Sequence, residues 1–300
     1  MIMKMENEVL KDFYLLADYL KKEGKIGDLN RYKEDFSAFL LHANHIKSYD
    51  FVAPFCKNKK VLDIGCFTGY GETRIFSQAK EIIAIDSDKT ALEFARLNRH
   101  IPNVKFKEAD AGQLPFPNES FDVIIAFQLI EHIPAAEVSN FLSGVKRVLK
   151  KKGVLFIATP NRKFRLMPFQ KPFNPEHYQE FTLKGLQKIL KNIFRNVQIK
   201  GIKANNFIEE IESKRVQKSF YRAYIRNPLS SSFNKTFYIT IQRLLKKNKS
   251  HIISPSTNEN TLKANKLAFN SLFQKFSMND FYLESKMINK SMILFAICRK

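Results

Sequence analysis

Short apolar segments alternate with helical ones between residues 60 and 202, and this alternation limits the fold more than any other feature of the chain. The apolar segments have the length of strands, and most carry no polar residue at alternate positions; they lie at 61–64, 82–85, 104–106, 121–127, 154–158 and 194–202. Strands of this kind are typical of a parallel sheet that helices cover on both faces. Together with a further strand-like segment at 280–298, they predict an α/β fold with a doubly wound, mostly parallel sheet of seven strands.

The segments outside this alternation are mainly helical. Apolar residues at helical spacing predict helices at 5–22 and 30–55. We expect four parts: an N-terminal helical cap at 1–55, an α/β core at 56–202, a basic helical insertion or lid at 203–279, and the last strand or strands at 280–300. Within the insertion, FNKTFYITIQRLLKK at 233–247 has the pattern of a basic amphipathic helix.

Several classes of protein are excluded by simple features. The three scattered cysteines, Cys56, Cys66 and Cys298, form neither a disulfide framework nor a zinc-ligand spacing. Charged residues interrupt the first twelve positions, unlike a secretory signal, and no stretch approaches the roughly 18 apolar residues of a membrane span. We expect a cytoplasmic protein. A peripheral contact with the inner face of the membrane is compatible with this expectation.

A cluster of glycines marks the predicted binding turn. Three of the ten glycines, Gly65, Gly69 and Gly71, fall within seven residues of the segment VLDIGCFTGYGE at 61–72. In open α/β sheets, ligands bind at the carboxyl ends of the strands, where the topology changes direction. The run does not match the G-x-G-x-x-G turn of dinucleotide-binding dehydrogenases, so we favour another ligand over a dinucleotide.

Acidic residues end or follow the next two strands. Asp86 lies 21 residues after Gly65, where a carboxylate can accept both hydroxyls of a ribose. Asp110 follows the third strand and is placed to meet an adenine amino group, and the fourth strand leads into FDVIIAFQLIEHI at 121–133. Each acid alone also fits a helix cap or a solvated loop. Their joint occurrence predicts an adenosine-like ligand.

This constellation resembles the class I S-adenosylmethionine-dependent methyltransferases over residues ~43–200 and the final strand. LKKKGVLFIATPNR at 149–162 and HYQEFTLKGL at 177–186 resemble segments of one subgroup, the type 11-like methyltransferases. HIKSYDFVAPFCKNKKVLDIG resembles the approach to the first strand in relatives that are associated with polysaccharide biosynthesis. The resemblance implies S-adenosyl-L-methionine as the cofactor.

The resemblance also implies which residues bind that cofactor. It places Asp63, Gly65 and Gly69 at the methionine end, Asp86 at the ribose, Asp110 at the adenine, Gln128 at the far wall and Tyr49 over the cofactor, and it adds the neighbouring Cys66, Phe67, Ser87 and Ala111. Members of the family usually have glycine at the position of Phe67, so this ring must point away from the ligand or pack on it. This departure motivates a contrasting hypothesis, a methyltransferase-like scaffold that only binds.

Two histidines are candidates for the catalytic proton acceptor. The fold should bring His132, after the fourth strand, and His177, in a proline-containing loop, near the methyl group, and histidine titrates in the useful range. Each also fits a structural role, as a helix cap or as a hydrogen bonder in a loop. His42 and His45 lie three residues apart without a third ligand, so we expect no metal.

Charge is unevenly divided along the chain. Residues 1–145 hold 18 basic and 21 acidic side chains, whereas residues 146–300 hold 32 and 8. Three interpretations remain open for the basic half: an anionic, carrier-linked acceptor met at an anionic membrane surface, RNA, or a lid whose lysines only keep the surface soluble. We expect a small-molecule or carrier-linked acceptor, saccharide or lipid-like and methylated at oxygen, with nucleic acid less favoured as a partner.

Overall fold

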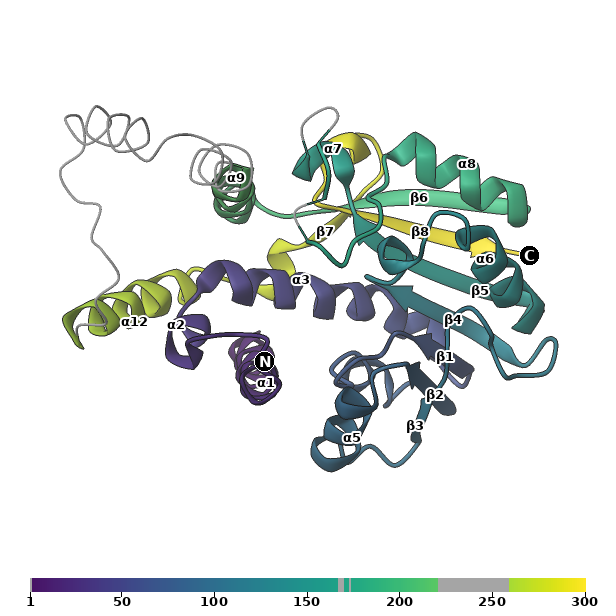
Figure 1. Cartoon of the computed structure of the whole chain (residues 1–300), viewed down its shortest axis with the longest axis horizontal. Coiled ribbons are helices and arrows are strands. Elements are labelled where there is room, and N and C mark those ends of the chain that lie inside the picture. The colour runs from purple at the N-terminus through teal and green to yellow at the C-terminus, as the bar shows by residue number, and fades with distance from the viewer. Residues whose placement is uncertain (1, 167–169, 173, 221–258) are drawn as a thin grey trace, which may run out of the picture.

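The computed structural model describes residues 2–166, 170–172, 174–220 and 259–300, and it places one eight-stranded sheet at the centre (Figure 1). The strands follow the order β3-β2-β1-β4-β5-β8-β6-β7. Their bounds are β1 Lys60–Ile64, β2 Glu81–Asp86, β3 Val104–Glu108, β4 Phe121–Phe127, β5 Leu149–Pro160, β6 Asn196–Lys203, β7 Tyr282–Glu284 and β8 Ile293–Arg299.

The predicted α/β fold with a mainly parallel sheet is confirmed. Strands β3, β2, β1, β4 and β5 pair in parallel, whereas β8 pairs antiparallel with both β5 and β6. The sheet has one strand more than the seven we predicted, because the segment after residue 280 forms two strands, of which the short β7 pairs with the edge of β6. The chain reverses its direction across the sheet between β1 and β4, so the carboxyl ends of these two strands form the switch point at which ligands bind.

Helices cover both faces of the sheet. Their bounds are α1 Ile2–Lys22, α2 Leu29–Lys33, α3 Phe36–Val52, α4 Glu72–Ile75, α5 Lys89–Asn98, α6 Val138–Val148, α7 Arg162–Arg165, α8 Leu183–Ile193, α9 Asn206–Phe220 and α12 Glu259–Phe273. Neighbouring strand residues such as Val61 and Leu62 point to opposite faces and belong to two separate apolar clusters. Both faces are therefore buried, which explains why the strands show no polar alternation.

The single helix predicted at 30–55 is two helices. Asp28 caps α2 by accepting from the Arg31 backbone N–H, and Asp35 caps α3 by accepting from the Ser37 and Ala38 N–H groups. Two caps only seven residues apart start two helices, because each satisfies the free N–H groups of a separate helix start. The prediction missed this break because it followed the apolar spacing alone.

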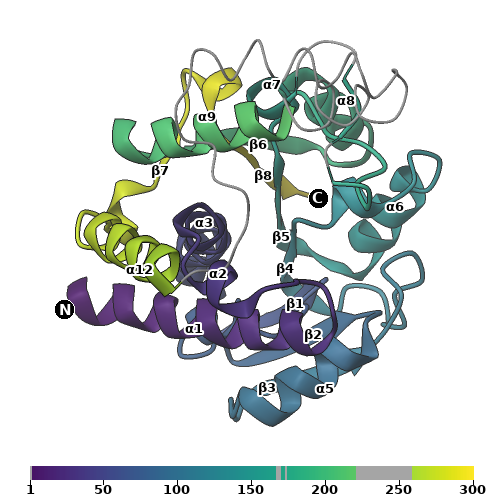
Figure 2. The ribbon, with the colours of Figure 1, turned by 60° about the vertical axis from the view of Figure 1, so that its left-hand side comes forward.

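The N-terminal helices and the insertion pack against each other. Phe36 and Phe39 at the start of α3 contact Phe269, Phe273 and Phe276 of α12 and the turn after it, with ring centroids 5.0–6.4 Å apart. Figure 2 shows α12 beside α3. The cap and the described part of the insertion therefore share one aromatic core.

The predicted amphipathic helix at 233–247 lies outside the described residues. In the part of the chain that the structure describes, no helix combines the length and the apolar character needed to cross a membrane.

Candidate functional site

The glycine-rich turn after β1 has a backbone that requires glycine at two positions. Gly65 and Gly69 have φ angles of +81° and +71°, which glycine adopts readily. A Cβ on Gly69 would also lie 2.8 Å from the Phe106 ring. The N–H groups of Gly65 and Cys66 both donate to the Ile85 carbonyl, which ties the turn to the end of β2.

Phe67 occupies a left-handed backbone position with a φ of +50°, the conformation for which glycine is preferred. Its ring lies edge-on to Tyr19 of α1 at 5.3 Å between centroids, and the Lys25 ammonium lies 5.3 Å above it. The ring therefore packs against the N-terminal helix, and this contact offsets part of the backbone strain. The bulky residue at this position is accommodated by the cap.

Asp86, the predicted ribose ligand, holds the turn through both of its carboxylate oxygens. Its Oδ2 accepts from the Phe67 N–H at 2.8 Å and its Oδ1 accepts from the Asp88 N–H at 2.9 Å. The next residue, Ser87, is exposed. Asp110 is also exposed, beside the half-buried Ala111, and accepts from the Gly112 N–H at 2.7 Å.

Asp63 lies in a buried carboxyl pair that the sequence did not reveal. Its Oδ2 accepts from the Tyr49 hydroxyl at 2.9 Å, while its Oδ1 has no hydrogen-bond partner. Glu72, at the start of α4, is fully buried, and neither carboxyl oxygen has a partner. Burial raises the pKa of Asp63 to about 7 and also raises the pKa of Glu72. Tyr49 is 2% exposed, so it supports the turn through Asp63.

Unpartnered polar groups around this turn fit a polar, adenosine-containing ligand. Gln128 follows β4 with a φ of +52°, and its buried Nε2 has no hydrogen-bond partner. The Thr68 hydroxyl within the turn is also buried without a partner. Buried polar groups normally find partners, so these groups favour a ligand rich in donors and acceptors. The residues present therefore fit S-adenosylmethionine.

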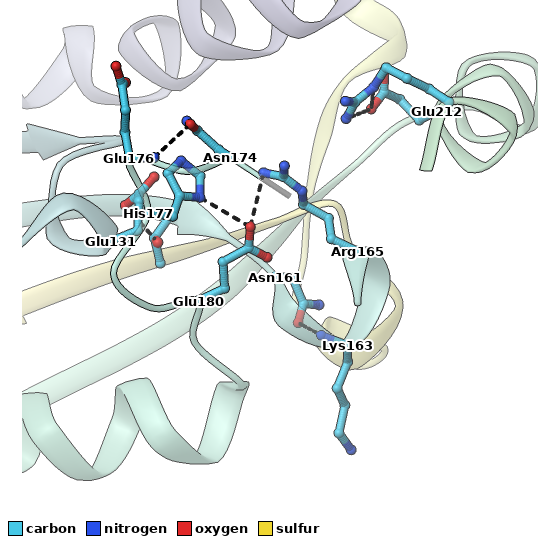
Figure 3. Close-up of polar contacts among 11 residues, drawn as sticks. Glu131, Asn161, Lys163, Arg165, Asn174, Glu176, His177, Glu180 and Glu212 are labelled. Atoms are coloured by element: carbon cyan, nitrogen blue, oxygen red, sulfur yellow. Dashed lines mark hydrogen bonds and ion pairs between the residues drawn. The ribbon is translucent and has the colours of Figure 1, made fainter. Parts of the chain in front are cut away.

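The two candidate catalytic histidines lie together beyond β4 and β5. The rings of His132 and His177 are edge-on with centroids 4.7 Å apart. His177 Nδ1 lies 3.1 Å from Glu180 Oε1, and the Arg165 guanidinium lies 3.6 Å from the same oxygen (Figure 3). Glu180 therefore orients His177 and neutralises part of the Arg165 charge.

Glu131 completes this group. It is fully buried, its Oε2 accepts from the Thr159 hydroxyl at 2.9 Å, and its Oε1 has no partner. Burial raises its pKa to about 7. The sequence analysis missed Glu131, Glu180 and Arg165 as site residues, although the EH pair after β4 and the H-x-x-E spacing at 177–180 were the available signals.

His42 and His45 remain structural in the described part of the chain, where they join no group of three candidate metal ligands. Burial lowers the pKa of His42 to about 3 and that of His45 to about 4. Both are therefore neutral at physiological pH, and their buried Nε2 atoms have no partners.

The chain matches a known family model and is similar to several known proteins. A family model described as a methyltransferase domain matches residues 56–286. A "Probable S-adenosylmethionine-dependent methyltransferase" of Mycobacterium tuberculosis is 36% identical over 146 residues, 49% of this chain and 52% of that protein. A ubiquinone biosynthesis O-methyltransferase of Bartonella tribocorum is 24% identical over 190 residues, 63% of this chain and 72% of that protein.

Among solved structures, a SAM dependent methyltransferase from Archaeoglobus fulgidus has a TM-score of 0.49 at 15% identity, covering 85% of this chain and 92% of that one. The chain spans about half the length of the mycobacterial curated relatives that it matches.

Proposed function

Because the chain belongs to the class I S-adenosylmethionine-dependent methyltransferase family, we propose that it transfers a methyl group from S-adenosylmethionine to an oxygen atom of a small or carrier-linked acceptor. The observation that carries this proposal is the convergence of His132, His177 and Glu131 beyond β4, the strand that Gln128 follows. Proton-accepting groups at this edge of the sheet are what methylation of a hydroxyl requires. The ubiquinone O-methyltransferase relative supports oxygen as the methylated atom.

The chain's own residues bind the cofactor, orient the acceptor and accept a proton. The cofactor supplies an electrophilic methyl group on a sulfonium centre. The turn at residues 65–71 and Asp86 would hold the adenosine and methionine parts, while Gln128 would close the side toward the acceptor. His177, held by Glu180, and the neighbouring Glu131 and His132 present lone pairs at which the proton of the acceptor hydroxyl is removed.

A saccharide or lipid-like acceptor that bears an anionic group is the partner we propose. The excess of basic side chains in residues 146–300 supports an anionic acceptor or carrier, because clustered positive charge raises the local concentration of anions. Peripheral contact with an anionic membrane, at the cytoplasmic side, belongs to the same proposal.

Cofactor binding tests the proposal directly. Calorimetric titration should show that the wild type binds S-adenosylmethionine and its demethylated product, and that Asp86→Ala weakens both by about 30- to 100-fold, since charged hydrogen bonds contribute about 2–3 kcal/mol. Glu108→Gln is the matched control, because Glu108 is the exposed acid paired with Asp86 on the adjacent strand. Absence of cofactor binding by the wild type would contradict the proposed methyltransferase activity. It would favour the alternative hypothesis of a methyltransferase-like scaffold that only binds another partner.

A further inference from the structure

Three potential metal ligands converge at the end of β4. One ligand atom each from Glu131, His132 and His177 lies within 4.8 Å of the others. Donors bonded at about 2.1 Å to one tetrahedral ion lie about 3.4 Å apart, so a modest contraction brings the three into range. Two imidazoles with one carboxylate form a recurrent set for first-row divalent ions.

The side chains of this group are not hydrogen-bonded to one another, although they lie close together. This arrangement indicates a bound cation between them. Glu131 Oε1 is buried without any hydrogen-bond partner, and one carboxylate oxygen of Glu131 lies within 4.8 Å of a ring nitrogen of each histidine. Figure 3 shows Glu131 on one side of the His177 ring and Glu180 on the other. The carboxylate accepts no hydrogen bond from the neighbouring histidines at this oxygen. Ligands that surround a common cation are arranged in the same way.

The remaining polar atoms of the three side chains are held by partners outside the group. Glu131 Oε2 accepts from Thr159, His177 Nδ1 faces Glu180, and the His132 ring is within hydrogen-bonding reach of the Glu176 backbone. Partners of this kind fix the ring orientation and tautomer of metal-binding histidines, most often through a carboxylate. Arg165 is the nearby cation, and its ion pair with Glu180 offsets its charge.

We infer that Glu131, His132 and His177 bind a divalent first-row transition-metal ion, with Zn²⁺ as the best match, which coordinates the acceptor oxygen. The inference rests on the proposed function for the presence of that acceptor. Three ligands from the described residues leave one tetrahedral position for the hydroxyl. In this arrangement the three side chains act as metal ligands and no longer as the proton acceptors described under the proposed function. The ion lowers the pKa of the bound hydroxyl, whose proton passes to water; the oxygen then forms the bond to the methyl carbon while the carbon–sulfur electrons return to sulfur. This replaces our expectation of a metal-free site.

Metal binding itself tests the inference, without a known acceptor. Chelator-treated protein should bind one Zn²⁺ per chain in calorimetry and elemental analysis. Glu131→Gln, His132→Ala and His177→Ala should each weaken binding at least 100-fold, and Glu180→Gln, which acts through His177, about 10- to 100-fold. His100→Ala, which alters an exposed histidine outside the group, should change it less than twofold.

Three further measurements make the result decisive. Circular dichroism checks that each variant is folded, and Mg²⁺ should bind far more weakly than Zn²⁺, because imidazole ligands disfavour it. Equal Zn²⁺ affinity in the wild type and in folded His177→Ala would overturn the inference. Cofactor titration of the chelator-treated protein separates the two proposals: cofactor binding without Zn²⁺ binding contradicts the metal site alone, and Zn²⁺ binding without cofactor binding contradicts the methyltransferase.

Discussion

Replacing Gly71 with alanine is expected to lower the free energy of unfolding by about 3–5 kcal/mol, from overpacking and a lost buried hydrogen bond. The backbone of Gly71 has a φ of −68° and a ψ of −39°, which alanine adopts without strain. The effect comes from contact, because an added Cβ would overlap the ring of Tyr49. That ring is buried, donates its hydroxyl to Asp63 and packs 4.9 Å from the Phe127 ring, so it has little room to move.

Gly144→Ala is the matched control for this substitution. Gly144 lies inside α6, where nothing lies within 4 Å of an added Cβ. The same chemical change should therefore raise the free energy of unfolding by up to about 1 kcal/mol. Urea unfolding followed by circular dichroism measures both variants. A Gly71→Ala protein as stable as the wild type would show that Tyr49 does not lie against the turn.

The buried carboxyl pair predicts a second large effect, a loss of stability as pH rises. The pKa of Asp63 in the folded chain is about 7, above the usual value of 3.8, and that of Glu72 is also raised, in both cases mainly by burial. A carboxyl group whose pKa is raised by folding stabilises the fold most below its unfolded pKa, and that stability is lost as pH rises through the folded pKa. From pH 5 to 8, the wild type should lose about 2–4 kcal/mol relative to Glu72→Gln.

The groups around the pair determine the size of this effect. Tyr49 donates to Asp63, the half-buried Tyr70 and the buried Cys66 lie close, Asp86 adds a negative charge and Arg99 a positive one. Urea unfolding at pH 5, 6, 7 and 8 should give a flatter profile for Glu72→Gln than for the wild type, whereas Glu93→Gln, an exposed change on α5, should keep the wild-type profile. Identical profiles for Glu72→Gln and the wild type would show that Glu72 does not contribute to the loss of stability at high pH.

The sequence was sufficient for the strands of the core and for the glycine-rich turn, because both depend on local patterns. Apolar runs of strand length located the strands of the core, and the clustered glycines located the turn that the left-handed conformations of Gly65 and Gly69 require. Asp86 was recognisable because it ends a strand at a fixed distance from that turn. The binding roles of these residues remain predictions.

The acceptor side was less accessible to sequence analysis, because its groups meet only through the tertiary fold. Glu131 follows β4, Arg165 lies on α7, and His177 and Glu180 lie in the loop before α8. A buried glutamate has the same letter as an exposed one, so neither spacing nor composition distinguishes Glu131 or Glu72 from a solvated acid. The aromatic core shared by α3 and α12 was missed for a similar reason, since phenylalanines more than 200 residues apart carry no sign of contact.

The position of β8 has a consequence for how the protein is made. This strand, formed by Ile293–Arg299, lies between β5 and β6 and pairs with both along its own length. On the ribosome, the five parallel strands can assemble early, but β6 finds its neighbour only when residues 293–299 have emerged. Non-local pairings of this kind slow folding and leave strand edges exposed to aggregation in the interval. Nascent chains stalled before residue 293 are therefore expected to depend most on chaperones.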